Sequence, residues 1–424
     1  AYCYGLCFLS LVVQPIQSSL IDFCNDYRDC TVCVNHNSWH ESCRWCPRDQ
    51  KCHAKGSTVT ACKRAENIKY DTRSYCNNLV LSKYDPELSY KMLKLAAVAY
   101  DPLDPQECLD NAVDGKFELE QVNTANCDFF GNKCSAFLAV SHVEKAIVIS
   151  VRGSTDFGQV FVEFVQSLVL PKTGFGGGKV QRYWKQGFDS LWPCFKTKFK
   201  DLHREYPSYK IWVTGHSLGG AVASLISTEL TRHLKVPRQK VILYTFGMPR
   251  VGNYDFALEH DRNVNNSWRV VNSNDLVPHF PTVLPNIISG PYHHGIEAFY
   301  KPNANNYKAN YKECHGKPFN EDKKCSFTEL PTGIKAHKTY FGIAVGTFHK
   351  DHCKLSAIRK RRDTTEANST FVYPLRKCAA YTYDSKTDKY TRFNPIISGS
   401  RKTKTVIAYG YVALFLGTLL INLT

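Results

Sequence analysis

Apolar positions change their spacing near Ser89, where they begin to recur at the helical period. Further along the chain, short and largely apolar runs are typical of buried strands, and segments with helical periodicity separate them. The clearest of these helical segments is 221–234. The strand-like runs are 136–141, 146–151, 211–213, 241–246 and 268–271. This alternation predicts an α/β fold with a mostly parallel central sheet and helices on both of its faces.

Cysteines crowd the N-terminal part of the chain, where eight of the 18 fall within residues 22–78. A segment this short buries little apolar surface, so disulfides are the expected source of its stability. Two pairs inside it, Cys30-x2-Cys33 and Cys43-x2-Cys46, also have the spacing of four zinc ligands. We favour disulfides over zinc, because the four remaining cysteines and an apolar run of signal-peptide length within residues 1–19 suit an oxidising compartment.

Both ends of the chain carry targeting patterns. Residues 1–19 hold an apolar run of signal-peptide length followed by small residues, which predicts export. A basic and polar extension over 355–404 precedes a hydrophobic C-terminal tail over 405–424. The tail is interpreted as a signal for a glycosylphosphatidylinositol anchor, and a membrane-spanning helix stays open as the alternative. We therefore expect a secreted or extracellular protein, with attachment to the cell surface through the tail as a further hypothesis.

Composition and charge narrow the range of partners. The chain has 424 residues, of which 43% are hydrophobic and 13% aromatic, so it is globular rather than disordered. Lys and Arg number 54 against 38 Asp and Glu, which gives a net charge of +16. No motif that reads nucleic acid accompanies this charge, so nucleic acid is not an expected partner. An anionic lipid surface fits a positive secreted protein better. The sequence identifies no protein partner.

The segment Gly215-His216-Ser217-Leu218-Gly219 matches the pattern G-x-S-x-G. It follows a strand-like run at 210–213 and precedes the helical segment 221–234, which is the context of a nucleophile elbow. The two glycines leave space for the sharp turn that this elbow requires. A serine hydroxyl is a weak nucleophile at neutral pH and needs a histidine base oriented by a carboxylate. Ser217 is therefore the candidate nucleophile.

The carboxylate and the base should follow Ser217 in the order Asp, then His. Asp275 lies just beyond the predicted strand 268–271, at the end of a parallel sheet where site residues gather. Five histidines are candidates for the base, and the residues alone do not rank them. They are His279, His293, His294, His315 and His337.

Four separated motifs resemble those of the class-three lipases, also called fungal lipase-like proteins. They are Gly-His-Ser-Leu-Gly-Gly-Ala at 215–221, Thr-Phe-Gly-Met-Pro-Arg-Val-Gly-Asn at 245–253, Asn-Asp-Leu-Val-Pro at 274–278 and Ala-His-Lys-Thr-Tyr-Phe-Gly at 336–342. The resemblance covers a catalytic domain at about 89–354 and implies the α/β-hydrolase fold. It also implies a catalytic triad of Ser217, Asp275 and His337, and gives His293 a structural role.

An oxyanion hole needs backbone N–H groups aimed at the negative oxygen of the reaction intermediate. Leu218 follows the nucleophile at a helix N-terminus and is the first expected donor. The segment Arg152-Gly153-Ser154-Thr155 resembles the family's Arg-Gly-Thr/Ser turn, which implies Ser154 as the second donor. The resemblance places a lid within 157–170, and a core helix is the alternative there. Neither a metal nor an organic cofactor is required.

Two other cysteine patterns carry structural expectations. The spacing around Cys43-Arg-Trp-Cys46 resembles the plexin-semaphorin-integrin cysteine module, which implies that 22–78 is a structural spacer rather than a catalyst. Cys314 and Cys325 bracket a hydrophilic loop and are expected to pair with each other.

These patterns predict a secreted serine hydrolase that cleaves carboxylic ester bonds of lipids at a lipid-water interface, in the manner of a triacylglycerol lipase. A phospholipase A1 and an esterase of soluble substrates remain alternatives, because the sequence does not show the shape of the pocket. A non-catalytic lipid-binding or adhesion protein on the same fold is the alternative from another class.

Overall fold

The computed structural model describes most of the central part of the chain and fragments of its ends. The described residues are 23–26, 30, 33, 43–46, 51–54, 57, 83–102, 105–126, 133–155, 172–282, 290–301, 306–314, 321–322, 324–330, 333–354, 381–384 and 389–392. The predicted signal peptide, the predicted lid and the hydrophobic C-terminal tail lie outside them. The extension at 355–404 is described only as a hairpin of β17 (Tyr381–Asp384) and β18 (Lys389–Arg392).

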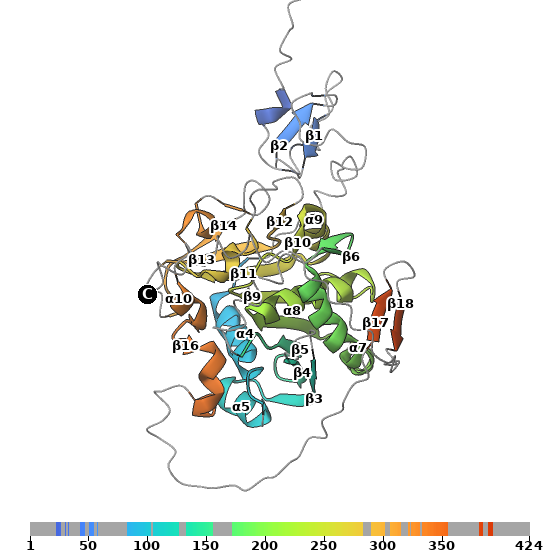
Figure 1. The fold of residues 1–424 in the computed structure, drawn as a ribbon, viewed down its shortest axis with the longest axis vertical. Helices are drawn as coiled ribbons and strands as arrows, with labels where there is room; N and C mark the ends of the chain where they lie inside the picture. Colours follow the sequence, from blue (N-terminus) through green and yellow to red (C-terminus); the bar gives the residue numbers. More distant parts are fainter. Residues whose placement is uncertain are drawn as a thin grey trace, which may run out of the picture.

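An eight-stranded mixed sheet forms the centre of the molecule (Figure 1). In spatial order its strands are β14 (Tyr311–Cys314), β13 (Ile296–Tyr300), β11 (Asn266–Asn272), β9 (Val241–Phe246), β8 (Lys210–His216), β5 (Ala146–Val151), β4 (Lys133–Ser141) and β3 (Phe117–Asn126). The five strands from β13 to β5 run parallel, and the pairs at both edges are antiparallel. The predicted strands are thus confirmed, and the predicted α/β class with them.

Helices cover both faces of the sheet, because its central strands are apolar on both sides. In β5, Ile147 and Ile149 pack into one core with α7 (Arg182–Glu205) and α8 (Leu218–Arg232). The intervening Val148 packs into the opposite core with α4 (Pro86–Val98). The other helices among the described residues are α5 (Pro105–Ala112), α9 (Tyr254–Asn263) and α10 (Ile334–Lys338). Successive side chains of β5 thus point to opposite faces and are apolar on both, as expected for a sheet that is buried on both sides.

The helix predicted near Ser89 begins three residues earlier, at Pro86. The Asp85 carboxylate accepts hydrogen bonds from the backbone N–H groups of Glu87 and Leu88, both at 3.0 Å, and so caps the first turn. Ser150 Oγ on β5 donates to the Leu95 carbonyl at 2.9 Å. This hydrogen bond fixes α4 against the middle of the sheet.

Smaller elements surround the central sheet. A second sheet joins β12 (Pro291–Tyr292), β10 (Gly252–Asn253), β7 (Gly178–Val180) and β6 (Thr173–Phe175). A short hairpin pairs β15 (Thr339–Tyr340) with β16 (Ile343–Ala344). The described part of the chain also contains the 3-10 helices η1 (Phe23–Asp26), η2 (Val277–His279), η3 (Ser326–Thr328) and η4 (Val345–Asp351). Within the described ranges, no helix combines the length and the apolar character needed to cross a bilayer.

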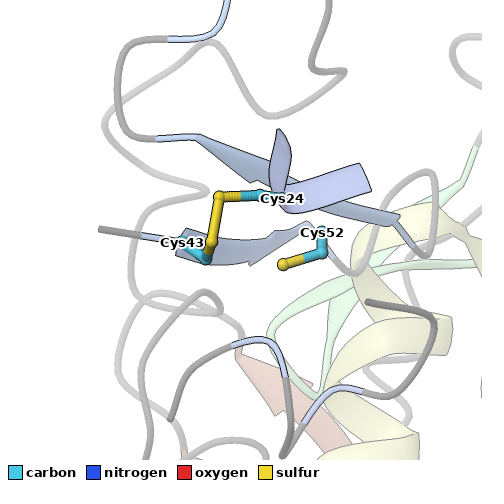
Figure 2. A group of neighbouring side chains, drawn as sticks. All are labelled: Cys24, Cys43 and Cys52. Carbon is cyan, nitrogen blue, oxygen red and sulfur yellow. A yellow bond between two sulfur atoms is a disulfide. The ribbon is translucent and has the colours of Figure 1, made fainter. Parts of the chain in front are cut away.

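The N-terminal cysteine region contains a hairpin of β1 (Cys43–Cys46) and β2 (Lys51–Ala54) tied by disulfides. Cys24 on η1 is bonded to Cys43, and Cys33 is bonded to Cys52, whose side chain lies beside the first bridge (Figure 2). Cys30 and Cys46 are disulfide-bonded as well. The zinc alternative was therefore wrong, because all four of its proposed ligands are held in disulfides.

The cysteine region packs against elements that surround the central sheet. Trp45 on β1, 7% exposed, belongs to an apolar cluster that includes Tyr254 and Leu258 of α9 and Tyr292 of β12. The Tyr254 and Tyr292 rings meet edge to face with their centroids 6.0 Å apart. The contact joins the disulfide-tied hairpin to α9 and to the second sheet.

A polar cluster is buried between α8, α9 and the central sheet. His260 Nδ1 and Nε2 form hydrogen bonds with the hydroxyls of Thr228 and Ser267, at 2.9 and 3.0 Å, and His294 Nε2 lies 2.5 Å from Ser224 Oγ. The two imidazole rings stack at 3.8 Å. Ligand atoms of both histidines and Asp261 lie within 4.8 Å of one another. Because hydroxyls already occupy both His260 nitrogens, we interpret the cluster as polar packing rather than a metal site.

Because of this cluster, we expect the folded protein to lose stability in acid. Burial lowers the pKa of His260 to about 3, and that of His294 well below its usual value. Below an unfolded pKa of about 6.5, the unfolded chain binds protons that the folded chain does not, so stability is complete above that pH and falls as the pH drops towards 3. The free energy of unfolding in urea should decrease by about 1.4 kcal/mol per pH unit per histidine between pH 6 and pH 4. His260→Gln, which hydrogen-bonds without titrating, should reduce that slope, and an unchanged slope would contradict the assignment.

Candidate active site

Ser217 lies in a sharp turn between β8 and α8, as the sequence predicted. Its φ of 57° and ψ of −129° place a non-glycine residue in the left-handed region, which costs backbone energy and is typical of residues held for function. A Cβ on Gly219 would come within 2.2 Å of the Val151 carbonyl oxygen, so only glycine lets the turn approach β5 this closely. The Ser217 side chain is thus held at the carboxyl end of the parallel strands.

His337 and Asp275 form a buried pair. His337 Nδ1 lies 2.9 Å from both carboxylate oxygens of Asp275, and both side chains are fully buried. Asp275 follows β11, and His337 belongs to α10, which begins at Ile334 just beyond a bridge between Gly333 and Asp275. The two residues are 62 positions apart in the chain, and this bridge brings them together.

Two further donors fix the Asp275 carboxylate. The Tyr340 hydroxyl donates to Oδ2 at 2.5 Å, and the Val277 backbone N–H donates to Oδ1 at 2.9 Å. Burial, and then the negative charge of Asp275, raise the pKa of Tyr340 well above its usual value, so the hydroxyl keeps its proton. Tyr340 falls inside the Ala-His-Lys-Thr-Tyr-Phe-Gly motif, but the sequence analysis assigned it no role. Its position three residues after the candidate base His337 was the feature of the sequence that could have indicated a role at the site.

Gly247 connects the serine to the histidine-aspartate pair. The Ser217 N–H donates to the carbonyl of Phe246 at 2.9 Å. The next residue, Gly247, has φ +58°, and a Cβ there would lie 2.6 Å from Asp275 Oδ2 and 2.7 Å from His337 Nδ1. The end of β9 therefore touches all three predicted triad residues, and it leaves no space for a side chain at Gly247.

The predicted oxyanion turn lies next to Ser217. A Cβ on Gly153 would be 3.2 Å from the Ser217 Cβ and 2.6 Å from the His216 carbonyl oxygen. Ser154 follows directly and is partly buried. Leu218, the other predicted donor, is the first residue of α8, so its N–H lies in the first turn, which no intrahelical carbonyl satisfies. Both predicted donors therefore flank the serine.

Three of the other candidate histidines lie within the described residues, and none of the three forms a hydrogen bond with Asp275. His293 Nε2 donates to the Pro278 carbonyl at 2.8 Å, and burial holds its pKa well below the usual value. His294 belongs to the polar cluster beneath α8. Burial also lowers the pKa of His279, while His315 lies outside the described residues. Of the candidates that the structure describes, only His337 forms a hydrogen bond with Asp275.

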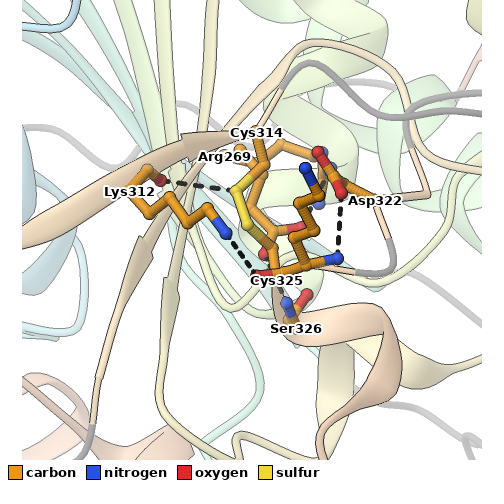
Figure 3. Close-up of a disulfide and its surroundings, with 8 residues drawn as sticks. Arg269, Lys312, Cys314, Asp322, Cys325 and Ser326 are labelled. Carbon is orange, nitrogen blue, oxygen red and sulfur yellow. Dashed lines mark hydrogen bonds and ion pairs between the residues drawn. A yellow bond between two sulfur atoms is a disulfide. The ribbon is translucent and has the colours of Figure 1, made fainter.

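The Cys314–Cys325 disulfide, predicted from the sequence, supports the strand that leads to Asp275. Both sulfurs pack with Val271 and Phe299 in a small apolar cluster. Figure 3 shows the bridge between the end of β14 and the start of η3, with Arg269 nearby.

Two buried ion pairs hold the disulfide loop against the rest of the site. Arg250, which follows β9, donates to both carboxylate oxygens of Glu321 at 2.8 and 2.7 Å. Arg269 Nη2 lies 3.3 Å from Glu297 Oε2, and Glu297 Oε1 accepts from the backbone N–H of Ser326 at 3.0 Å. These charges are desolvated, so losing one partner would leave the other unpaired at high cost.

Comparison with known proteins gives a consistent result. The family model "Lipase (class 3)" matches residues 148–284. A lipase from Caenorhabditis elegans is 31% identical over 311 residues, which cover 66% of this chain and 87% of that protein. The secreted mono- and diacylglycerol lipase 1 of Fusarium solani is 30% identical over 218 residues, 49% of this chain and 59% of that protein.

Solved structures agree with the fold. The lipase of Rhizopus microsporus var. chinensis aligns with a TM-score of 0.54 and 29% identity, covering 63% of this chain and 91% of that one. A triacylglycerol lipase whose catalytic centre is formed by a serine protease triad aligns with a TM-score of 0.51 and 26% identity, covering 61% of this chain and 95% of that one. The chain therefore belongs to the class 3 lipase family, and it is a carboxylic ester hydrolase of the α/β-hydrolase fold.

Proposed function

We propose that the protein is a secreted lipase that hydrolyses carboxylic esters of lipids through a triad of Ser217, His337 and Asp275. The observation that carries this proposal is the buried pair of His337 Nδ1 and Asp275, which meets the elbow of Ser217 around Gly247. The family and the triad of the structurally similar triacylglycerol lipase support the same assignment.

In this mechanism the side chains of the triad have distinct tasks. Ser217 Oγ attacks the ester carbonyl carbon while His337 Nε2 takes the hydroxyl proton. Asp275 holds the imidazole through Nδ1 and stabilises its positive charge, and Tyr340 and Val277 keep the carboxylate in place. The N–H groups of Leu218 and Ser154 stabilise the negative oxygen. The C–O bond to the alcohol breaks, His337 protonates that alcohol, and water then hydrolyses the acyl-serine by the same steps.

Triacylglycerols and their partial glycerides are the proposed substrates, and extracellular space is the proposed location. Similar proteins named as mono- and diacylglycerol lipases and as a triacylglycerol lipase support the substrate, and the word "secreted" in the former names supports the location. The disulfides of the cysteine region and of the catalytic region are stable in an oxidising compartment and support export. A non-catalytic binding role would not need this set of contacts around Ser217.

A substrate panel tests the proposed chemistry. The purified protein should release fatty acid from emulsified triolein faster than from phosphatidylcholine vesicles, and faster per enzyme than it cleaves soluble p-nitrophenyl acetate. Titration measures the fatty acid released from triolein and from phosphatidylcholine. Absorbance at about 400 nm measures the p-nitrophenolate released from the soluble ester. Preferential cleavage of the vesicles would instead assign a phospholipase, and binding to all three without any hydrolysis would overturn the enzymatic proposal.

A further inference from the structure

His216 directly precedes the candidate nucleophile Ser217, but both of its ring nitrogens have hydrogen-bond partners other than the serine hydroxyl. Nε2 lies 2.8 Å from the backbone carbonyl oxygen of His337, and Nδ1 lies 2.9 Å from the hydroxyl of Tyr100. The imidazole rings of His216 and His337 are 4.5 Å apart between centroids. The His216 ring therefore contacts both the ring and the backbone carbonyl of the candidate base His337.

The chemistry of these contacts fixes the tautomer of His216. A carbonyl oxygen only accepts, so Nε2 carries the hydrogen and donates to His337. Burial, and then the neighbouring His337, lower the pKa of His216 well below its usual value, so the ring is neutral. Nδ1 is consequently an acceptor, and the Tyr100 hydroxyl donates to it.

Tyr100 extends these contacts to the candidate oxyanion turn. It follows α4 and is 2% exposed, and its hydroxyl oxygen packs against the backbone of Gly153. The closeness of the two groups is evident from Gly153, where a Cβ would lie 2.2 Å from the Tyr100 oxygen. Gly153 precedes Ser154, the second candidate oxyanion donor.

We propose that Tyr100 and His216 are positioning residues, which set the spacing between the candidate oxyanion turn and the candidate base through a chain of contacts from the Gly153 backbone to the Tyr100 hydroxyl, the His216 imidazole and the His337 carbonyl. The inference rests on the proposed function of Ser217, His337 and Ser154. Each of the two hydrogen bonds has one donor and one acceptor, so removing the Tyr100 hydroxyl takes its donor from the buried Nδ1 of His216 and removes the packing contact with Gly153.

The effect should fall on kcat rather than on KM. The network touches the groups that are proposed to act on the transition state. Small displacements of catalytic groups lower the rate of the chemical step without a matching loss of ground-state affinity. A merely structural role would lower the amount of folded enzyme and leave the kcat of the folded fraction unchanged.

Tyr100→Phe is the first test, with Tyr244→Phe as the matched control. Tyr244 is also buried in the core around α4, and its hydroxyl accepts a hydrogen bond from the Asp85 N–H at 3.2 Å, away from Ser217 and His337. With p-nitrophenyl butyrate, Tyr100→Phe should lower kcat by about tenfold and change KM by less than about twofold. Tyr244→Phe should keep the parental kcat per active site, counted by burst titration.

His216 gives a second, independent test by conservative rescue. His216→Gln retains an N–H donor at the reach of Nε2, and His216→Leu does not. The Gln variant should therefore retain a kcat about tenfold higher than that of the Leu variant. Equal kcat in the two His216 variants, together with parental kcat in Tyr100→Phe, would overturn the positioning role. If the parental protein itself neither hydrolyses esters nor reacts in the titration, the proposed function fails instead.

Discussion

Replacing Ser217 with alanine is expected to lower kcat for ester hydrolysis by a factor on the order of 10⁴ or more. The nucleophile acts together with His337 and Asp275, so the loss of one member removes nearly the whole contribution of the triad. Alanine also fits the turn, because the change deletes one oxygen atom without adding volume. Titration of fatty acid from emulsified triolein, compared with the parental protein, measures the effect.

Ser227→Ala is the matched control for this experiment. Ser227 lies within α8, the helix that Ser217 precedes, and is also buried. Its hydroxyl donates to the Ser224 carbonyl at 2.8 Å, away from the candidate site. It should retain kcat within about twofold, since loss of one such internal hydrogen bond affects stability by only about 1 kcal/mol. A folded Ser217→Ala protein with the parental rate would exclude Ser217 as the nucleophile.

Removal of the candidate base is expected to have an effect of similar size. His337→Ala should lower kcat by about 10⁴-fold, because no other described histidine is hydrogen-bonded to Asp275. Added imidazole should restore part of the rate, since the lost side chain leaves a space beside Asp275 that the small base can occupy. Steady-state rates at increasing imidazole concentration measure this rescue.

His293→Ala distinguishes catalysis from structure. His293 holds the Pro278 carbonyl through Nε2, so its loss should lower the midpoint of urea unfolding while the folded enzyme keeps its kcat. Imidazole should not change the rate of this variant. If His293→Ala is inactive and rescued by imidazole while His337→Ala is fully active, the two roles must be exchanged.

The elbow of Ser217 was predictable because its determinants are local in the chain. Strand β8, the crowded glycines and helix α8 follow one another within 23 residues, and each leaves its own pattern in the sequence. Apolar runs likewise identified the buried strands, because a sheet covered on both faces tolerates few polar positions. Asp275 was found by the same logic, as a carboxylate just beyond the end of a strand.

The remaining parts of the site depend on contacts between distant segments. His337 was chosen by resemblance, since no local pattern shows that α10 lies beside Asp275. Tyr100 and His216 are 116 positions apart, and only the packing of α4 against β8 brings them within hydrogen-bonding distance. The apolar contact between Trp45 and α9 is of the same kind. Hydrophobic patterns predict which residues are buried, but they do not state which buried residues meet.

The zinc alternative for the cysteine region illustrates a related ambiguity. Two Cys-x2-Cys pairs serve either a metal or a disulfide framework, and the spacing does not separate these uses. The structure distinguishes the two uses, because Cys43 is bonded to Cys24 and Cys33 is bonded to Cys52. The partner choice depends on the fold of the hairpin β1–β2, which is a property of the whole region.

Covalent labelling of the active serine tests the central claim most directly. A fluorophosphonate forms a bond from its phosphorus to an activated serine oxygen and releases fluoride, so it reports a working nucleophile without depending on the choice of lipid substrate. Peptide mapping by mass spectrometry of the labelled, inactivated protein should find one adduct, on Ser217, and none in Ser217→Ala. An active protein that is inactivated by a label on another residue, or that carries no label at Ser217 when activity is lost, would contradict the account.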